Sequence, residues 1–446
     1  MRGVVWMNST DRGILRMAVP AIISNITVPL LALVDVAIVG HLGSAAYIGA
    51  IAVGGMIFNV VYWIFNFLRM GTSGMTSQAL GARQLTDTVR MLARSVAVAM
   101  VIALVLLLLQ RPILRVALLF MCGADSSVAP LAATYYNICI WGAPAMLGLY
   151  SLTGWLIGMQ NSRTPMVIAI AQNVVNIAGS LLLVYGLGLK VEGVAAGTLI
   201  AQWFGFLLAA TLIAVHYRRF LRRNAVRGAV FAREAMARFF SVNRDIFLRT
   251  VCLVAVMSFF TSAGAWQGET LLAVNTLLMQ FFLVFSYIMD GFAYAAEALS
   301  GKAYGAMTGA RQPVAGLLSV VRRLFLWGAA MVVLFTLLYI SGGSTFLRLL
   351  TDDATVITAA AAYLPWAVLL PVASCAAFIW DGVFIGCTLT RGMLLSMVAA
   401  AAAFFAVYFS LRPTLVNHAL WLAFLVYLAV RGIAQTLIFR RTAVRL

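Results

Sequence analysis

Four acidic side chains lie inside strongly apolar stretches of the sequence: Asp35, Asp290, Glu297 and Asp381. An aspartate at the centre of a membrane-spanning helix costs about 2.5–3.5 kcal/mol to insert, so such residues face the bundle interior and mark pathways. Burial disfavours the ionised form, which makes each of them a candidate proton carrier. Alternatively, the group stays ionised and attracts Na⁺ or an organic cation. A third interpretation is purely structural: the acid is a fixed polar partner of Arg69, of Arg431 or of the backbone, and it stabilises the fold.

The spacing of these acids suggests how they are arranged. Asp290 and Glu297 are separated by two helical turns, so they lie on one face of a helix. Asp381 precedes a G-x-x-x-G motif and can face the same cavity. Asp35 follows Pro20 in one apolar segment, and a proline allows a helix to bend because it removes a backbone hydrogen bond. Protonation of Asp35 is therefore expected to bias a straight–bent equilibrium in this helix.

The elements that must position these groups are membrane helices. The chain has 446 residues, of which 63% are apolar and only 10% charged, and its mean hydropathy is +1.01. Soluble proteins carry about 25% charged residues. Apolar runs of about 20 residues, the length of a membrane span, recur throughout. We predict an all-α polytopic membrane protein with twelve spans, at 14–40, 48–78, 88–110, 129–152, 162–187, 193–216, 244–266, 271–299, 317–340, 356–385, 392–411 and 418–438.

Three of these spans, the second, eighth and tenth, are too long to be simple perpendicular helices.

The net charge of +18 is concentrated on one side of the predicted topology. The positive-inside bias then places both termini in the cytoplasm and argues against a nucleic-acid surface. The five cysteines show no C-x-x-C spacing, which favours packing over metal or redox roles.

An internal repeat divides the chain. "QALGA" at 78–82 matches "KAYGA" at 302–306, and "TGWLIGMQNSR" at 153–163 matches "DGVFIGCTLTR" at 381–391. We predict an N-terminal six-helix lobe (1–216), a cytoplasmic linker (217–243) and a C-terminal six-helix lobe (244–446). Six spans per half insert both halves in the same direction, so the lobes are related by a pseudo-two-fold axis along the membrane normal. Such lobes enclose a cavity that rocking would expose alternately.

Aromatic and methionine side chains of the second and eighth spans are candidates for lining that cavity. Polarisable sulfur and ring surfaces accommodate varied apolar ligands, and rings attract organic cations. Most such residues on these helices must be core or lipid-facing, because a helix has several faces. The subset predicted to contact substrate is Met56, Tyr62, Met279, Phe282, Tyr287, Met289 and Tyr294.

Several stretches resemble the multidrug and toxic compound extrusion (MATE) transporters, and within them the DinF-type branch. They are "PAIISNITVPLLALVDVAIVGHLG" (20–43), "TSQALGAR" (76–83), "YIMDGFAYAAEALSGKAYGA" (287–306), "WDGVFIG" (380–386) and "NHALWLAF" (417–424). The resemblance covers nearly the whole chain. It implies two six-helix lobes around a central cleft, and export of organic, often cationic compounds driven by H⁺ or Na⁺.

The resemblance also implies residue roles. The first-helix acid of the family falls on Asp35 and its bending proline on Pro20, and the tenth-helix acid falls on Asp381. The fifth-helix asparagine falls on Asn176 and a sixth-helix threonine on Thr198.

The chain departs from the family pattern at two places. Where many relatives carry a second fifth-helix acid, "NIAGS" places Ser180. The seventh-helix glutamate of Na⁺-type relatives is missing from "VAVMSFFTSAG" (254–264). The first departure leaves the N-terminal lobe with one carboxylate and with Asn176, Ser180 and Thr198 as neutral hydrogen-bonding groups. The second weakens a Na⁺ site in the C-terminal lobe and favours protons, although Asp290 and Glu297 can substitute there.

We therefore expect a monomeric, proton-coupled exporter of organic cations or amphipathic compounds in the plasma (inner) membrane, with no cofactor and no nucleic-acid partner. Na⁺ coupling stays open. The main alternative is a lipid-linked precursor flippase of the same superfamily, although its cationic cavity is not matched by mainly acidic intramembrane charges. An enzyme is disfavoured because no H-E-x-x-H, D-x-D or Ser–His pairing is suitably placed, and a duplicated bundle with buried acids suits alternating access better than a channel.

Overall fold

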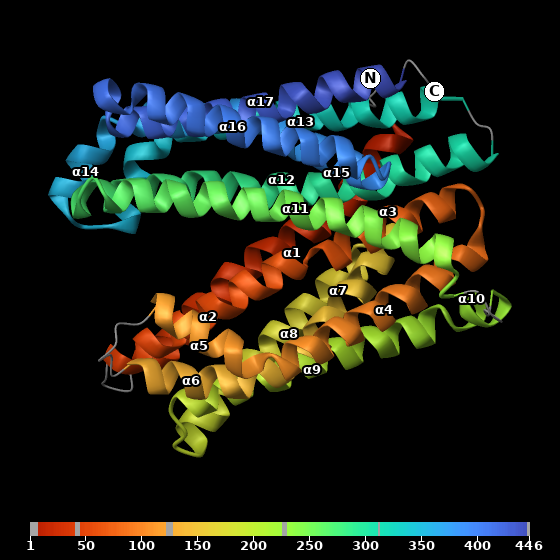
Figure 1. Cartoon of the computed structure of the whole chain (residues 1–446), viewed down its shortest axis with the longest axis horizontal. Helices are drawn as coiled ribbons and strands as arrows, with labels where there is room; N and C mark the ends of the chain where they lie inside the picture. Colours follow the sequence, from red (N-terminus) through yellow and green to blue (C-terminus); the bar gives the residue numbers. More distant parts are fainter. Residues whose placement is uncertain (1–7, 41–44, 122–127, 225–229, 311–312, 444–446) are drawn as a thin grey trace, which may run out of the picture. The chain divides into compact units, whose positions relative to one another are not determined.

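The computed structural model describes residues 8–40, 45–121, 128–224, 230–310 and 313–443, and in these ranges the chain is helical with no strand. Figure 1 shows the helices in chain order. They are α1 (Ser9–Gly40), α2 (Ala45–Phe65), α3 (Phe67–Gly81), α4 (Leu85–Leu108), α5 (Gln110–Met121), α6 (Val128–Cys139), η1 (Ile140–Gly142), α7 (Ala143–Gly158), α8 (Arg163–Leu181), the π-helix η2 (Leu182–Gly186), α9 (Val191–His216), α10 (Arg218–Arg223), α11 (Arg233–Ala265), α12 (Glu269–Ala310), α13 (Ala315–Leu350), α14 (Ala354–Ala361), α15 (Leu364–Gly386), α16 (Thr390–Leu415) and α17 (Asn417–Ala443).

Eleven helical segments within the described ranges are long and apolar enough to cross a membrane. They coincide with the second to twelfth predicted spans. The first predicted span lies on α1, whose 32 residues are also long enough to cross a hydrocarbon core of about 30 Å. The polytopic all-α architecture is therefore confirmed.

Two of the three overlong spans are interrupted. The second divides into α2 and α3 at Asn66, and the tenth into α14 and α15 at Ala362 and Tyr363. Both interruptions agree with the prediction that these spans are too long to be simple helices. In the tenth, a proline stands at the start of α15, where it has no backbone N–H to continue the hydrogen bonds of α14. The eighth span is one continuous helix of 42 residues, α12, longer than any bilayer core requires.

The described helices form two compact units. Unit 1 comprises Met1–Ile22, Gly81–Arg83 and Phe240–Leu446, and unit 2 comprises Ile23–Leu80 and Gln84–Phe239. The start of α1 thus packs with the C-terminal half of the chain, whereas the predicted lobe boundaries placed all of it in the N-terminal half.

Contacts at both ends of this first stretch of α1 explain its placement in unit 1. The Asp11 carboxylate accepts a hydrogen bond from Trp327 Nε1 at 3.1 Å and pairs with Arg323 at 3.4 Å. Three turns after Asp11, α1 passes so close to Gly291 of α12 that a side chain at Gly291 would collide with Ile22.

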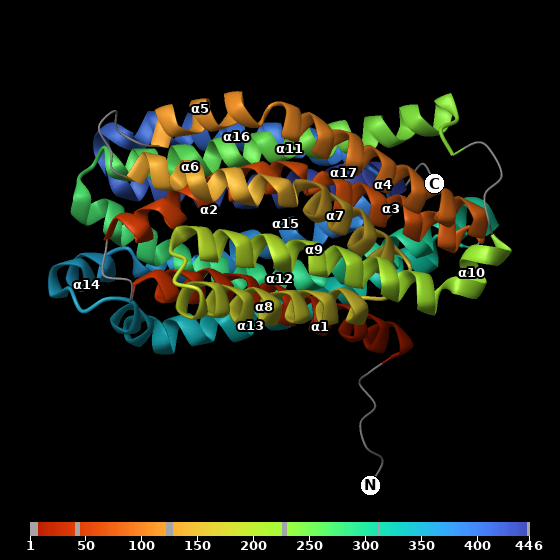
Figure 2. The same ribbon diagram turned by 90° about the horizontal axis from the view of Figure 1, so that it is seen from below.

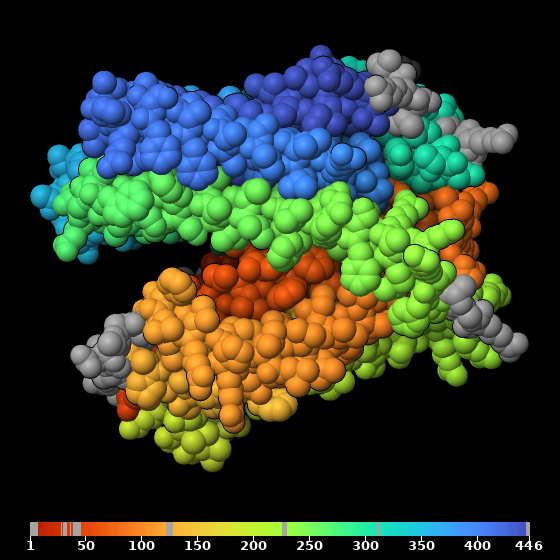
Figure 3. All heavy atoms as spheres, in the orientation of Figure 1, coloured from red at the N-terminus to blue at the C-terminus, as the bar shows by residue number. Residues whose placement is uncertain are grey.

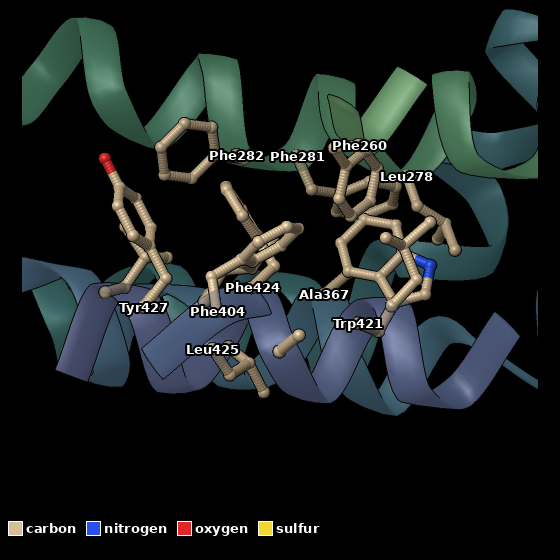
Figure 4. Packing of buried hydrophobic residues seen from close by; sticks show 14 of the residues in the cluster. Phe260, Leu278, Phe281, Phe282, Ala367, Phe404, Trp421, Phe424, Leu425 and Tyr427 are labelled. Carbon is tan, nitrogen blue, oxygen red and sulfur yellow. The ribbon is translucent and has the colours of Figure 1, made fainter. Parts of the chain in front are cut away.

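Aromatic packing forms the core of unit 1. Phe260 of α11 and Phe282 of α12 contact Phe424 of α17, with ring centroids 5.3 and 5.2 Å apart, and Phe260 also packs edge-on against Trp421 (Figure 4). In the space-filling view α11, in green, lies along α16, in blue (Figure 3). The four described cysteines are free thiols, as the packing interpretation predicts, and Cys122 lies outside the described residues.

A smaller apolar core in unit 2 joins α7, α8 and α9. It contains Leu149, Leu152, Trp155, Leu156, Ile168, Ala209 and Ile213. The two views of the ribbon agree that α8 and α9 lie side by side in this unit (Figures 1 and 2). The Trp155 indole donates to the backbone carbonyl of Thr88 at 2.9 Å, which fixes α7 to α4.

The repeated G-x-x-x-G motifs serve the same structural purpose in each unit. In unit 2, Gly154 and Gly158 of α7 lie against the backbone carbonyl oxygens of Arg69 and Ser73 in α3. Glycine is needed at these positions because a Cβ would collide with the neighbouring backbone.

In unit 1, Gly382 and Gly386 of α15 lie in the same way against the carbonyl oxygens of Ala293 and Glu297 in α12. The contacted pairs differ by the offset of 224 residues that separates "QALGA" from "KAYGA". The internal match in the sequence therefore corresponds to one helix–helix contact made twice.

Gly386→Ala tests this contact. The added methyl group meets backbone atoms that cannot move aside, so we expect a loss of about 1–3 kcal/mol in the free energy of unfolding, measured in detergent micelles. Gly342→Ala in α13 is the matched control, because no atom lies within 4 Å of a Cβ there. Equal stability of the two variants would contradict the proposed close approach.

Candidate cation-coupling site

Asp35 lies with polar groups of three other helices in unit 2. Its carboxylate is within electrostatic reach of the Tyr135 hydroxyl and the Cys139 thiol, both of α6. The side chains of Tyr135 and Thr198 are hydrogen-bonded, and Asn176 Nδ2 of α8 donates to Thr198 Oγ1 of α9 at 3.1 Å. The acid, the asparagine and the threonine that the sequence singled out are thus brought into one cluster.

Backbone contacts hold α1 against α8 on both sides of Asp35. Asn173 Nδ2 of α8 donates to the carbonyl of Thr27 at 3.3 Å, and the Tyr185 hydroxyl of η2 donates to the carbonyl of Ile38 at 3.1 Å. The helix end that carries Asp35 is therefore fastened to the helix that carries Asn176 and Ser180.

Two glycines allow the close approach that the cluster requires. A side chain at Gly197 of α9 would collide with Ser180, and one at Gly54 of α2 would collide with the Tyr135 ring. Both Asn176 and Ser180 are consequently buried, with exposed fractions of 2% and 0%.

Several oxygens of the cluster are not satisfied by the described residues. Asp35 Oδ1, Asn176 Oδ1 and Ser180 Oγ are buried and have no hydrogen-bond partner among them. Buried polar atoms are normally paired, so these three oxygens have free hydrogen-bonding capacity within the described part of the chain. A group of oxygens around one carboxylate can accept a proton on the acid or hold a small cation.

The equivalent positions in unit 1 are aromatic. The repeat offsets of 224 and 228 residues relate Asp35 to Phe259 and relate Asn176 and Ser180 to Phe404 and Tyr408. The Phe259 ring packs against these two rings at centroid distances of 5.9 and 5.2 Å. One copy of the repeat thus has a polar cluster where the other has a closed apolar core.

Asp381 has a different environment from Asp35. Its Oδ2 accepts hydrogen bonds from Arg249 of α11 and Arg431 of α17, and its Oδ1 accepts one from Gln435 Nε2 at 2.7 Å. All four side chains are buried. Asp381 is thus a fixed partner of two arginines, which is the structural role considered in the sequence analysis. A carboxylate paired in this way is poorly suited to carry a cation.

From the sequence, Arg431 was named as a possible partner of an intramembrane acid, but Arg249 and Gln435 were not. Arg249 lies near the start of the predicted seventh span (244–266), directly after the charged connection, and was not considered as a partner for an acid. Helix α11 begins earlier, at Arg233, and runs through Arg249. Gln435 lies one turn after Arg431, a spacing that places both on one helix face and was available as a signal.

The other two acids lie on α12. Asp290 is half-buried and interacts electrostatically with Tyr287, and Glu297 is buried with an exposed fraction of 1%. Glu297 also supplies the backbone carbonyl that Gly386 contacts. Their predicted role as substitute cation ligands stays a prediction. Within the described ranges, no three His, Cys, Asp or Glu side chains are grouped to hold a metal ion.

The predicted cavity residues fall into different environments. Phe282 and Met289 are buried, and Phe282 belongs to the aromatic core of unit 1, where Met279 packs against it. Tyr62 is buried and stacked on Phe58 at 5.5 Å, whereas Met56 is 54% exposed. Tyr287 and Tyr294 are half-buried. The aromatic composition therefore does not by itself identify a lining surface.

Pro20 is buried in α1, two residues before the point at which the helix passes from unit 1 to unit 2. Its predicted role in helix bending stays a prediction.

Comparison with known proteins extends these observations. A family model described as MatE matches residues 20–182 and 246–411. The chain is 37% identical to DNA damage-inducible protein F of Escherichia coli (strain K12), over 98% of this chain and 94% of that protein. It is 27% identical to the probable multidrug resistance protein NorM of Bradyrhizobium diazoefficiens, over 74% and 70% of the two chains. A solved structure described as MATE in the bent conformation has a TM-score of 0.86 at 18% identity, covering 98% and 96%.

Because Asp381 is paired with two buried arginines, we expect the stability of the protein to depend strongly on the charge at this position. Asp381→Asn leaves two buried guanidinium groups without a counter-charge, so we expect the free energy of unfolding to fall by about 3–5 kcal/mol. The measurement is equilibrium unfolding in mixed detergent micelles.

The matched control replaces all three charges together, as Asp381→Leu, Arg249→Met and Arg431→Met. We expect this triple variant to be more stable than Asp381→Asn, because no unpaired charge is left buried. The three charges would not be coupled if the triple variant lost as much free energy of unfolding as the three single substitutions added together.

Proposed function

The chain belongs to the MatE family of transporters, and from this premise we propose that it exports organic, often cationic or amphipathic compounds by proton-coupled antiport with alternating access. It is a multi-pass membrane transporter and not an enzyme. A relative described as a probable multidrug resistance protein supports a varied organic cargo. The excess of arginine on one side of the spans supports cytoplasmic termini.

One observation carries the proposal of proton coupling. Asp35 is the carboxylate of the unit 2 cluster, and its neighbours there, Tyr135, Asn176 and Thr198, are neutral. Among the described residues no cationic side chain is paired with it. A carboxylate in such surroundings can become neutral by binding a proton, which an arginine-paired carboxylate does not need to do.

The proton gradient supplies enough energy for this role. Each elementary charge that crosses 100 mV releases about 2.3 kcal/mol. Two protons at that potential therefore support a gradient of a neutral compound of roughly a thousandfold, because about 1.4 kcal/mol corresponds to a factor of ten.

Na⁺ coupling is the second candidate. The side-chain oxygens of Asn176 and Ser180 favour it, because they are buried in the same unit as Asp35 and have no described hydrogen-bond partner. A lipid-linked precursor flippase is the third, and the single net positive charge of Asp381 with Arg249 and Arg431 favours an anionic group at that place.

Transport of a fluorescent organic cation into proteoliposomes tests coupling at Asp35. We expect an imposed pH gradient to drive transport by the wild type, and Asp35→Asn to reduce the driven rate at least about tenfold, because the exchangeable charge is lost. Asp87→Asn is the matched control, since Asp87 forms a partly exposed pair with Arg90 at 2.9 Å.

The same vesicles distinguish the alternatives. Transport driven by a Na⁺ gradient and not by a pH gradient would overturn proton coupling and leave export standing. Full pH-driven transport by Asp35→Asn would remove Asp35 from the coupling mechanism.

A further inference from the structure

A compact group of arginines follows the last turn of α9. Helix α10 carries Arg218, Arg219, Arg222 and Arg223, which we call the arginine face. All four side chains are exposed, and they line a hollow of about 600 Å³. At 100° per residue the four positions cover an arc of about 140°, so they form one surface rather than a ring around the helix.

The opposite side of α10 is anchored in the protein. Phe220 and Leu221, together with Tyr217 just before the helix, pack against the apolar core that joins α7, α8 and α9. The Tyr217 ring meets Trp155 edge-on at 5.0 Å, and its hydroxyl accepts a hydrogen bond from Asn161 Nδ2 at 3.2 Å. The arginine face is therefore held in one orientation by a buried aromatic contact.

The charge of this face is not balanced by nearby acids. None of the ion pairs formed in the described part of the chain includes any of the four arginines. Four positive charges on six residues repel one another, so a general excess of positive charge for membrane topology does not require them to be held so close together. An anion bound between them would remove this repulsion.

The position of α10 identifies the source of the anion. It starts two residues after His216, the last residue of the membrane-spanning helix α9, so the arginines lie where a span leaves the hydrocarbon. Lipid phosphates are concentrated at that level, and clustered arginines next to a span are attracted to anionic lipids. The planar guanidinium group also binds phosphate oxygens in pairs.

We infer that the arginine face of α10 binds the phosphate of an anionic lipid headgroup, such as that of phosphatidylglycerol. The bound lipid neutralises the four guanidinium groups and fastens the connection between the two halves of the chain to the membrane surface. This inference is independent of the transported compound and of the coupling ion.

The test uses purified full-length protein and native mass spectrometry to measure the binding of single phosphatidylglycerol and phosphatidylcholine molecules. We expect the wild type to bind phosphatidylglycerol at least about tenfold more tightly, and the variant with Arg218, Arg219, Arg222 and Arg223 all changed to Gln to lose most of that preference. Inorganic phosphate at matched concentration is expected not to displace the lipid.

A scattered variant with the same loss of charge provides the control. Arg12, Arg83, Arg233 and Arg441 are also exposed arginines, and changing all four to Gln is expected to alter the preference by less than about twofold. Equal losses in the two variants would show that only net charge matters and would overturn the site. Displacement by inorganic phosphate, or an unchanged preference in the α10 variant, would overturn the assignment to lipid.

Discussion

Burying an ionised carboxylate at hydrocarbon depth costs free energy, and the structure must offset this cost at each intramembrane acid. The acid can either pair with a cationic side chain or become neutral by binding a proton. Asp381 shares its charge with Arg249 and Arg431 in a buried contact that also includes Gln435. Asp35 forms no ion pair with the described residues and lies within electrostatic reach of two neutral groups, the Tyr135 hydroxyl and the Cys139 thiol. A carboxylate between two guanidinium groups gains little from a proton, whereas one among neutral groups becomes much easier to bury once protonated. The two acids, similar in sequence context, are thus suited to opposite purposes.

The duplicated architecture explains how both solutions coexist. The glycine contacts between α7 and α3 and between α15 and α12 repeat at the same residue offset, so the scaffold of the two halves is shared. The positions supported by that scaffold have diverged. By the repeat offset, the polar cluster around Asn176 corresponds to Phe404 and its neighbouring rings, which pack edge-on against Phe259. The polar cluster that contains Asp35 therefore has no equivalent at these positions of unit 1.

The sequence predicted the helices well because apolar runs longer than a bilayer core have few alternatives to spanning it. It also indicated that spans 48–78 and 356–385 were irregular, and Asn66 and Tyr363 are where those helices break. It could not assign side chains to faces. The spans are apolar on every side, so Phe282 and Met56 looked equivalent although one is core and the other exposed. Arg249 was missed for another reason: it lies at the charged start of a span, where an arginine is expected for membrane topology, and its partner Asp381 is 132 residues away in the sequence.

Helix α1 connects these properties physically. Its first residues are fixed in unit 1 by Asp11 and by the close approach to Gly291, and the part that carries Asp35 is fastened to α8 in unit 2. Pro20 stands two residues before the helix passes from one unit to the other, where a missing backbone hydrogen bond makes bending least costly. The described neighbours of Asp35, Tyr135 and Cys139, lie in unit 2, whereas the partners of Asp11 lie in unit 1. The bending of α1 that the sequence predicts from Pro20 and Asp35 stays a prediction. The structure adds that α1 makes contacts in both units, so a bend near Pro20 would lie between its two sets of contacts.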